Sequence, residues 1–265
     1  YTECFGFWFG VTALVTLDRW AHTARREELW LAGIFAGFAL GAKYPYGVLG
    51  LACFGVIAFL AARLHRPFLP ALFHFGLPAA LVVLPWLGRN LLMTGNPLYP
   101  LLFEGGAMTA LRLNQFTGLP AWGNWQDLLL LPLRATIDGY EGASGYGSAI
   151  GPLLLGLGLL ALPAWKAADE IRRHSLETAG AAALLVLLVW AFGNQASGFL
   201  IQTRFYFPLF PAFACLAAAG FGWLSGLEVP QVRIGRIFSA LALLALALNV
   251  VETGSGLVNS GALQV

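Results

Sequence analysis

Charged residues are scarce in this chain: Asp, Glu, Lys and Arg make up 11% of its 265 residues, whereas apolar residues make up 58%. Soluble domains carry about 25% charged residues, so this composition argues against one. The apolar residues come in long unbroken runs rich in Leu, Ala and Gly, unlike the short alternating segments of an outer-membrane barrel. The sequence therefore predicts an all-α, polytopic bundle of transmembrane helices.

Cysteines and basic clusters are also sparse. Cys4, Cys53 and Cys215 lie in apolar runs without metal-ligand spacing, which indicates small buried thiols. The net charge is only +2 and no basic cluster is interleaved with aromatics, so we expect no nucleic-acid partner. The sequence has no P-loop, nucleophile elbow, zinc spacing or dinucleotide fingerprint. We expect no resident cofactor or metal site, and leave open whether a divalent metal takes part.

Eight apolar segments approach the length of about 20 residues that a membrane helix needs. They are residues 4–17, 29–41, 46–62, 68–88, 150–165, 179–192, 205–224 and 237–251. The longest region outside them is a predicted outer-face loop, 92–147, in which two pieces mix Leu with single charges, as helices lying flat in the interface do. We treat 1–265 as a single transmembrane domain. Because Tyr1 is not Met and no signal peptide is present, we expect it to be a fragment whose N-terminal part is missing.

The fourth segment leaves the membrane within the stretch from Pro85 to Pro100. Residues 95–97, Gly-Asn-Pro, and Pro100 are strong helix stops, because proline lacks the N–H group and disfavours a helical conformation in the residue before it. Arg89 comes just before this exit, which places it at headgroup depth.

The basic residues divide unequally between the two sides of the predicted bundle. Short cytoplasmic loops are rich in Lys and Arg. If the first segment enters the cytoplasm at Asp18, ten of the 15 basic residues fall in cytoplasmic loops. The other five are isolated on the outer side: Lys43, Arg89, Arg112, Arg134 and Arg204.

Glu3, Lys43 and Arg89 lie at the outer ends of three different segments, and we expect them to converge on one face. A charge near the bilayer centre costs at least about 2.5 to 3.5 kcal/mol, so charges at segment ends call for a reason. One alternative is that Lys43 and Arg89 reach headgroup phosphates and that Glu3 is a solvated terminus. Arg204, at the start of a later segment, is ambiguous in the same way.

Several short motifs occur in a fixed order over roughly 210 residues. They are Tyr1-Thr2-Glu3, Leu31-Ala32-Gly33, Gly41-Ala42-Lys43-Tyr44, Pro85-Trp86 with Arg89-Asn90, Gly95-Asn96-Pro97-Leu98-Tyr99-Pro100, and Arg204-Phe205-Tyr206 with Pro208 and Pro211. The series resembles the bacterial multi-spanning glycosyltransferases of the GT-C fold, the group of the protein O-mannosyltransferases and the aminoarabinose transferases of lipid A.

The resemblance implies a glycosyltransferase in the bacterial inner membrane. At the outer face it would transfer a sugar from a polyprenyl-phosphate donor to a hydroxyl of a lipid, glycan or protein acceptor. Such a reaction needs a base for the acceptor proton and cations for the phosphate leaving group. By resemblance, Lys43, Arg89 and Arg204 would contact the phosphate, and Glu3 would be the second outer-face carboxylate. The family's principal catalytic Asp has no counterpart here, so we expect it upstream of Tyr1 and expect the fragment to be inactive alone.

Two other classes of function stay open. A transporter or flippase of a lipid-linked or amphipathic substrate also uses isolated intramembrane charges and helices broken by Gly and Pro. No internal repeat is detectable and the outer loop is rich in Trp, which argues against this class. A membrane scaffold without a site would leave the converging charges unexplained.

Overall fold

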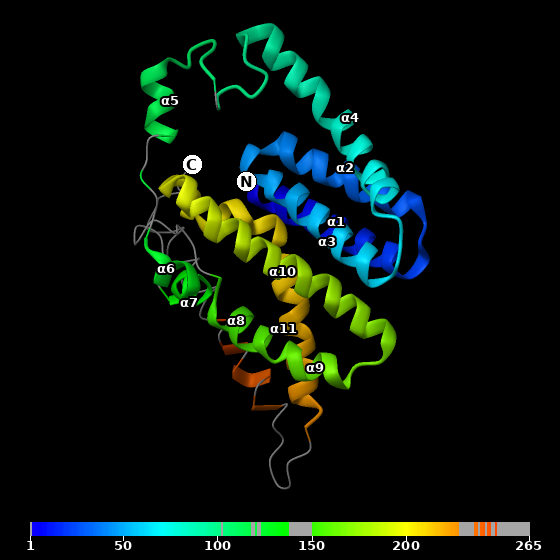
Figure 1. The fold of residues 1–265 in the computed structure, drawn as a ribbon. Helices are drawn as coiled ribbons and strands as arrows, with labels where there is room; N and C mark the ends of the chain where they lie inside the picture. The colour runs from blue at the N-terminus through cyan, green and yellow to red at the C-terminus, as the bar shows by residue number, and fades with distance from the viewer. Residues whose placement is uncertain are drawn as a thin grey trace.

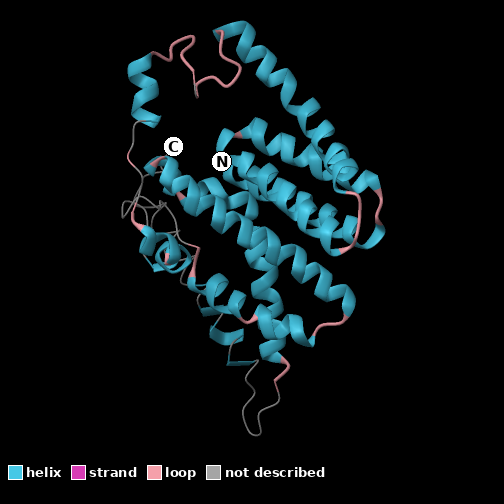
Figure 2. Cartoon of the chain, viewed as in Figure 1, coloured by secondary structure: helices cyan, strands magenta, loops and turns pink. Residues whose placement is uncertain are grey.

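A computed structural model describes residues 2–101, 103–117, 120, 123–137 and 150–227, and residues 236–237, 239–241, 243–244 and 247 beyond them. In this part of the chain the regular structure is helical, apart from an isolated β-bridge between Gly105 and Met108 (Figures 1 and 2). The predicted all-α class is therefore confirmed.

The structure has the following helical elements in the described residues. They are α1 (Thr2–Thr23), α2 (Arg26–Ala42), η1 (Tyr44–Tyr46), α3 (Gly47–Arg63), α4 (Phe68–Thr94), α5 (Ala110–Thr117), α6 (Trp125–Leu129), α7 (Leu131–Ile137), α8 (Pro152–Leu159), α9 (Ala161–Ala167), α10 (Glu170–Ala196), η2 (Gly198–Ile201), η3 (Thr203–Leu209) and α11 (Phe210–Ser225).

Four helical stretches in the described residues are long and apolar enough to cross a membrane, which supports a membrane protein. They are Tyr44–Arg63, Phe68–Thr94, Glu170–Ala196 and Thr203–Ser225. The predicted segments 4–17 and 29–41 lie within α1 and α2, whereas 150–165 is divided between the short helices α8 and α9. Most of 237–251 lies outside the described residues, so the total of eight membrane segments stays a prediction.

The predicted helix stop at residues 95–97 is confirmed, although α4 runs six residues beyond the predicted membrane segment 68–88. Helix α4 continues past Arg89 to Thr94, and Gly95 then adopts a left-handed conformation with φ of 73°. A single arginine does not end a helix, because arginine is a good helix former, whereas a left-handed glycine is a common C-terminal cap. Residues 92–94 therefore belong to α4, and the region predicted as the loop 92–147 contains α5, α6 and α7.

Helix α1 lies at the centre of the packed bundle, where it contacts α2, α3, α10, α11 and η3. Figure 1 shows α1, α2 and α3 side by side, with α4 against α2 and α8 and α9 against α11. Glycines allow two of these contacts. A Cβ added to Gly10 would lie 1.6 Å from the main-chain oxygen of Pro208, and one added to Gly33 would lie 2.1 Å from the main-chain oxygen of Phe75. Small residues let helices in membranes approach closely in this way.

We expect Gly33→Ala to destabilise the protein by about 1–3 kcal/mol, because its new methyl group collides with the main chain of α4. Gly50→Ala in α3 is the matched control, since no atom lies within 4 Å of a Cβ built there. Thermal unfolding of the purified protein in detergent measures both variants. Equal midpoints for Gly33→Ala and Gly50→Ala would contradict the close contact between α2 and α4.

Candidate functional site

The alternating helices carry the charged residues to two opposite ends of the bundle. We call the end where α1 begins, α2 ends, α3 begins and α4 ends the Lys43 end. We call the opposite end, which carries the α1–α2 and α3–α4 connections, the Arg66 end. The candidate site residues Glu3, Lys43, Arg89 and Arg204 all belong to helix ends at the Lys43 end.

An ion pair joins α1 to the tip of the α2–α3 hairpin. The Lys43 ammonium donates to Glu3 Oε1 at 2.9 Å, and the two side chains are 25% and 26% exposed. Glu3 lies in the first turn of α1, where the helix dipole favours a carboxylate. Lys43 is extended, with φ of −162°, and is followed by η1 with Pro45 in its first turn, so the chain reverses directly after it.

Aromatic rings surround the Lys43 ammonium and connect it to Arg204. The Lys43 Nζ lies 5.4 Å from the ring centroids of both Tyr46 and Phe205. The guanidinium of Arg204 lies 5.6 Å from the same Phe205 ring and donates to Gln202 Oε1 at 2.8 Å. One aromatic ring therefore has two cations beside it, each within the range of a cation–π interaction.

Arg89 is exposed on α4 and its guanidinium lies 5.6 Å from the Trp86 ring. Within the described residues it has no ion pair. The structure thus brings Glu3 and Lys43 into contact and places Arg204 beside them, while Arg89 reaches this end through its own helix and not through a contact with Glu3 or Lys43.

The Tyr44 hydroxyl holds α4 against the tip of the α2–α3 hairpin. It accepts hydrogen bonds from Asn90 Nδ2 at 2.8 Å and from Trp86 Nε1 at 3.3 Å, and donates to the Tyr99 carbonyl at 3.0 Å. Asn90 is buried, so its amide needs such a partner. Sequence reasoning missed this network, although Tyr44 and Asn90 stand next to Lys43 and Arg89 in the motifs. The available signal was two polar side chains in otherwise apolar segments.

Asn96 gives the Gly-Asn-Pro motif a structural role. Its side chain is completely buried. The amide donates to the carbonyl groups of Leu101 at 3.0 Å and Phe103 at 2.7 Å, and its oxygen accepts from the Leu98 N–H group at 2.9 Å. One side chain therefore folds the turn that follows α4, which keeps the Tyr99 carbonyl within reach of Tyr44.

The Arg66 end carries a separate set of charges. Ion pairs join Arg19 to Glu28 at 2.9 Å and Arg63 to Glu177 at 3.5 Å. Arg66 donates to the carbonyl groups of Trp20 and Ala21, and burial lowers the pKa of its guanidinium. These contacts tie the helix connections together at one end of the bundle.

Two histidines meet at the Arg66 end, which the sequence did not indicate. The rings of His22 and His174 lie 5.8 Å apart, and His22 Nε2 is 3.6 Å from Asp18 Oδ1. Across the residues that the structure describes, no group of three or more His, Cys, Asp or Glu side chains is arranged to hold a metal ion.

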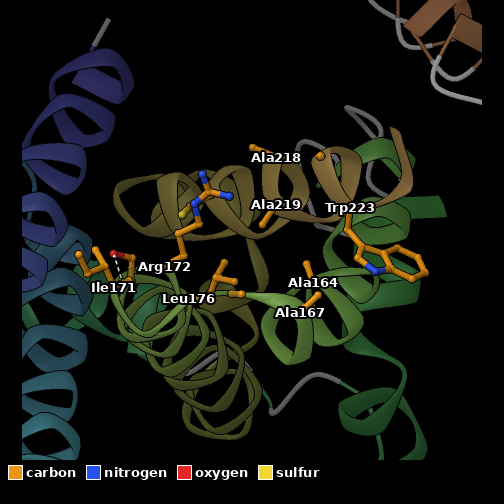
Figure 3. A pocket seen from close by; sticks show the side chains of 12 residues that line it. Ala164, Ala167, Ile171, Arg172, Leu176, Ala218, Ala219 and Trp223 are labelled. Carbon is orange, nitrogen blue, oxygen red and sulfur yellow. Dashed lines mark hydrogen bonds between the residues drawn. The ribbon is translucent and has the colours of Figure 1, made fainter. Parts of the chain in front are cut away.

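A cavity of about 510 Å³ opens at the Arg66 end, between α9, α10 and α11 (Figure 3). Its walls are mostly apolar, with Ala164 and Ala219 on facing helices, and Arg172 and Ser175 are its polar lining residues. None of the four candidate site residues lines it. The cavity and the Glu3–Lys43 pair are therefore separate features.

No family model, curated protein or solved structure matches this chain. The fold itself defines a class: an all-α protein in which four described helical stretches are long and apolar enough to cross a membrane. The features that bear on a more specific function are the sequence motifs and the geometry of the Lys43 end.

We expect Tyr44→Phe to destabilise the protein by about 1–3 kcal/mol, because the buried Asn90 amide loses its nearest acceptor. Tyr99→Phe is the matched control, since Tyr99 takes part through its main-chain carbonyl and keeps it. Unfolding in detergent, followed by tryptophan fluorescence, measures the difference. If Tyr99→Phe cost as much as Tyr44→Phe, the hydroxyl would not be the link between η1 and α4.

Proposed function

We propose that the Lys43 end binds a lipid-linked phosphate, and that the protein transfers a sugar from a polyprenyl-phosphate donor to an acceptor hydroxyl at the outer face of the bacterial inner membrane. The observation that carries the proposal is the Glu3–Lys43 ion pair: a carboxylate and an ammonium from different helices, three-quarters buried, at one end of an apolar bundle. Burying two charges is costly, so a pair retained there calls for a function.

The chemistry of sugar transfer requires both members of this pair. When the bond between the sugar and the phosphate oxygen breaks, the phosphate keeps the electron pair, and a nearby cation stabilises this leaving group. The acceptor oxygen forms the new bond to the sugar and loses its proton, which a carboxylate takes. Lys43 fits the first role and Glu3 the second.

The neighbouring cations support binding of a phosphate. Arg204 and Lys43 both lie beside the Phe205 ring, so this end carries two positive charges near one aromatic side chain. An arginine donates two parallel hydrogen bonds to phosphate, whereas a lysine acts as a point charge. When the phosphate binds, Lys43 can exchange its bond to Glu3 Oε1 for a bond to the phosphate.

The end of α4 supports binding of the lipid chain. Leu92 is 87% exposed and Met93 is 72% exposed, two and three residues after Asn90. An apolar helix surface next to an exposed guanidinium suits a donor that has a phosphate at one end and an isoprenoid chain at the other. In this account Arg89 is the third phosphate contact, used as the donor enters from the bilayer.

A transporter or flippase of a lipid-linked substrate is the second candidate. Helix α4 contains Pro78 and Pro85 in its interior, and helices interrupted by proline are common at transport sites. A transporter would move the donor across the bilayer with its sugar–phosphate bond intact, whereas a transferase breaks this bond. Product analysis therefore separates the two.

We expect Lys43→Gln and Arg204→Gln, each made in the full-length protein, to lower sugar transfer from a polyprenyl-phosphate donor by about 100-fold, because each removes a cation from the leaving group. We expect Glu3→Gln to lower transfer as strongly while donor binding is retained. Arg172→Gln is the control, since Arg172 is exposed at the Arg66 end. The assay follows radiolabelled sugar from donor to acceptor in vesicles with matched protein levels.

If Lys43→Gln transferred sugar at the unchanged rate, the proposed phosphate site would be contradicted. Movement of intact donor across the vesicle membrane without release of the lipid phosphate would favour the transporter.

A further inference from the structure

The helices α6 and α7 form a nearly continuous amphipathic unit in the region between α4 and α8. The hydrogen bonds Leu130 N–H to Gln126 and Arg134 N–H to Leu130 carry the helical pattern across the break between them. The Arg134 guanidinium also pairs with Asp127 at 2.5 Å. Asn124 caps the first turn in a capping box with Asp127.

One face of this unit is packed against the bundle. Leu131 and Ala135 are buried in the main hydrophobic core, and Asp127 is buried beside them. The opposite face is apolar and exposed: Trp125 is 67%, Leu129 is 72% and Leu133 is 46% exposed. Residues four positions apart lie on one side of a helix, so these three form a single line, the interfacial stripe.

Two main-chain hydrogen bonds hold the unit at the Lys43 end of the bundle. The Pro120 carbonyl, five residues before α6, accepts from the Gly198 N–H group, two residues after the end of α10. The Ala135 carbonyl in α7 accepts from the Ile150 N–H group, two residues before α8. The unit is therefore tied to the end of α10, a helix long enough to cross a membrane.

The last turns of α10 carry an exposed aromatic side chain. Phe192, about one turn before the end of α10, is 70% exposed, as expected for a side chain that faces lipid. Tryptophan is enriched at the depth where headgroups meet acyl chains. An amphipathic helix at this depth buries its apolar face in the boundary and keeps its charges toward water or protein.

We propose that α6 and α7 lie in the interface of the leaflet at the Lys43 end, with Trp125, Leu129 and Leu133 inserted into the boundary between headgroups and acyl chains. Membrane lipid, rather than another protein, covers the interfacial stripe. This anchor fixes the depth at which the Glu3–Lys43 pair meets the headgroups, and it does not depend on the proposed sugar transfer.

A fluorophore at position 129 tests the proposal directly. Cys4 and Cys215 are exposed and would be replaced by alanine, whereas Cys53 is buried and can stay. Leu129→Cys is then labelled with an environment-sensitive dye and the protein is reconstituted in phosphatidylcholine–phosphatidylglycerol vesicles. Glu104→Cys is the control at the same end of the bundle, because Glu104 is exposed and charged in the turn after α4. The unsubstituted background measures any labelling of Cys53.

We expect lipids with a spin label near the headgroup to quench the dye at position 129 several-fold more strongly than at position 104, and aqueous iodide to show the reverse order. Leu133→Cys should behave as Leu129→Cys does. Equal access of iodide to positions 104 and 129 would overturn the proposal, since the stripe would then face water. Protection from iodide without quenching by the lipid label would overturn it as well, because a protein surface, such as a second copy of this chain, would cover the stripe.

Discussion

The cost of placing charge in an apolar environment decides the layout of this molecule. Its charged side chains gather at the two ends of the helices, where they pair, as Glu3 does with Lys43 and Arg63 with Glu177. Between the ends the helices have little to hold them except close packing, so they meet through small residues such as Gly10 and Gly33. The bundle therefore has charged surfaces at its two ends and an apolar surface between them.

At the Lys43 end, polar side chains form two groups of contacts. One group is the Glu3–Lys43 ion pair with the Phe205 ring, which lies beside both Lys43 and Arg204. The other group is formed by the Tyr44 hydroxyl, which accepts a hydrogen bond from Asn90 on α4 and donates one to the Tyr99 carbonyl in the following turn. Because these hydrogen bonds fix the tip of the α2–α3 hairpin, they keep the Lys43 ammonium in place.

Much of the fold follows from local signals in the sequence. Long apolar runs predict helices, and Gly95 and Pro97 mark the end of α4, six residues beyond the predicted membrane segment 68–88. The break between α8 and α9 at Leu160 has a signal in Pro163, which cannot donate to the Leu159 carbonyl and so interrupts the predicted segment 150–165. The contact between Glu3 and Lys43 could be anticipated, because both residues lie at the outer ends of predicted membrane segments. The partners of Tyr44 could not, since they depend on how α4 packs against the hairpin and on a turn folded by Asn96.

The central claim is that the Lys43 end recognises a lipid-linked phosphate. A structure of the full-length protein in a lipid nanodisc with bound polyprenyl phosphate tests it most directly. We expect the phosphate to lie within hydrogen-bond distance of the Lys43 ammonium and beside Arg204, with the ion pair between Lys43 and Glu3 broken. A phosphate bound at the other end instead, at Arg172 in the cavity between α9, α10 and α11, would contradict it.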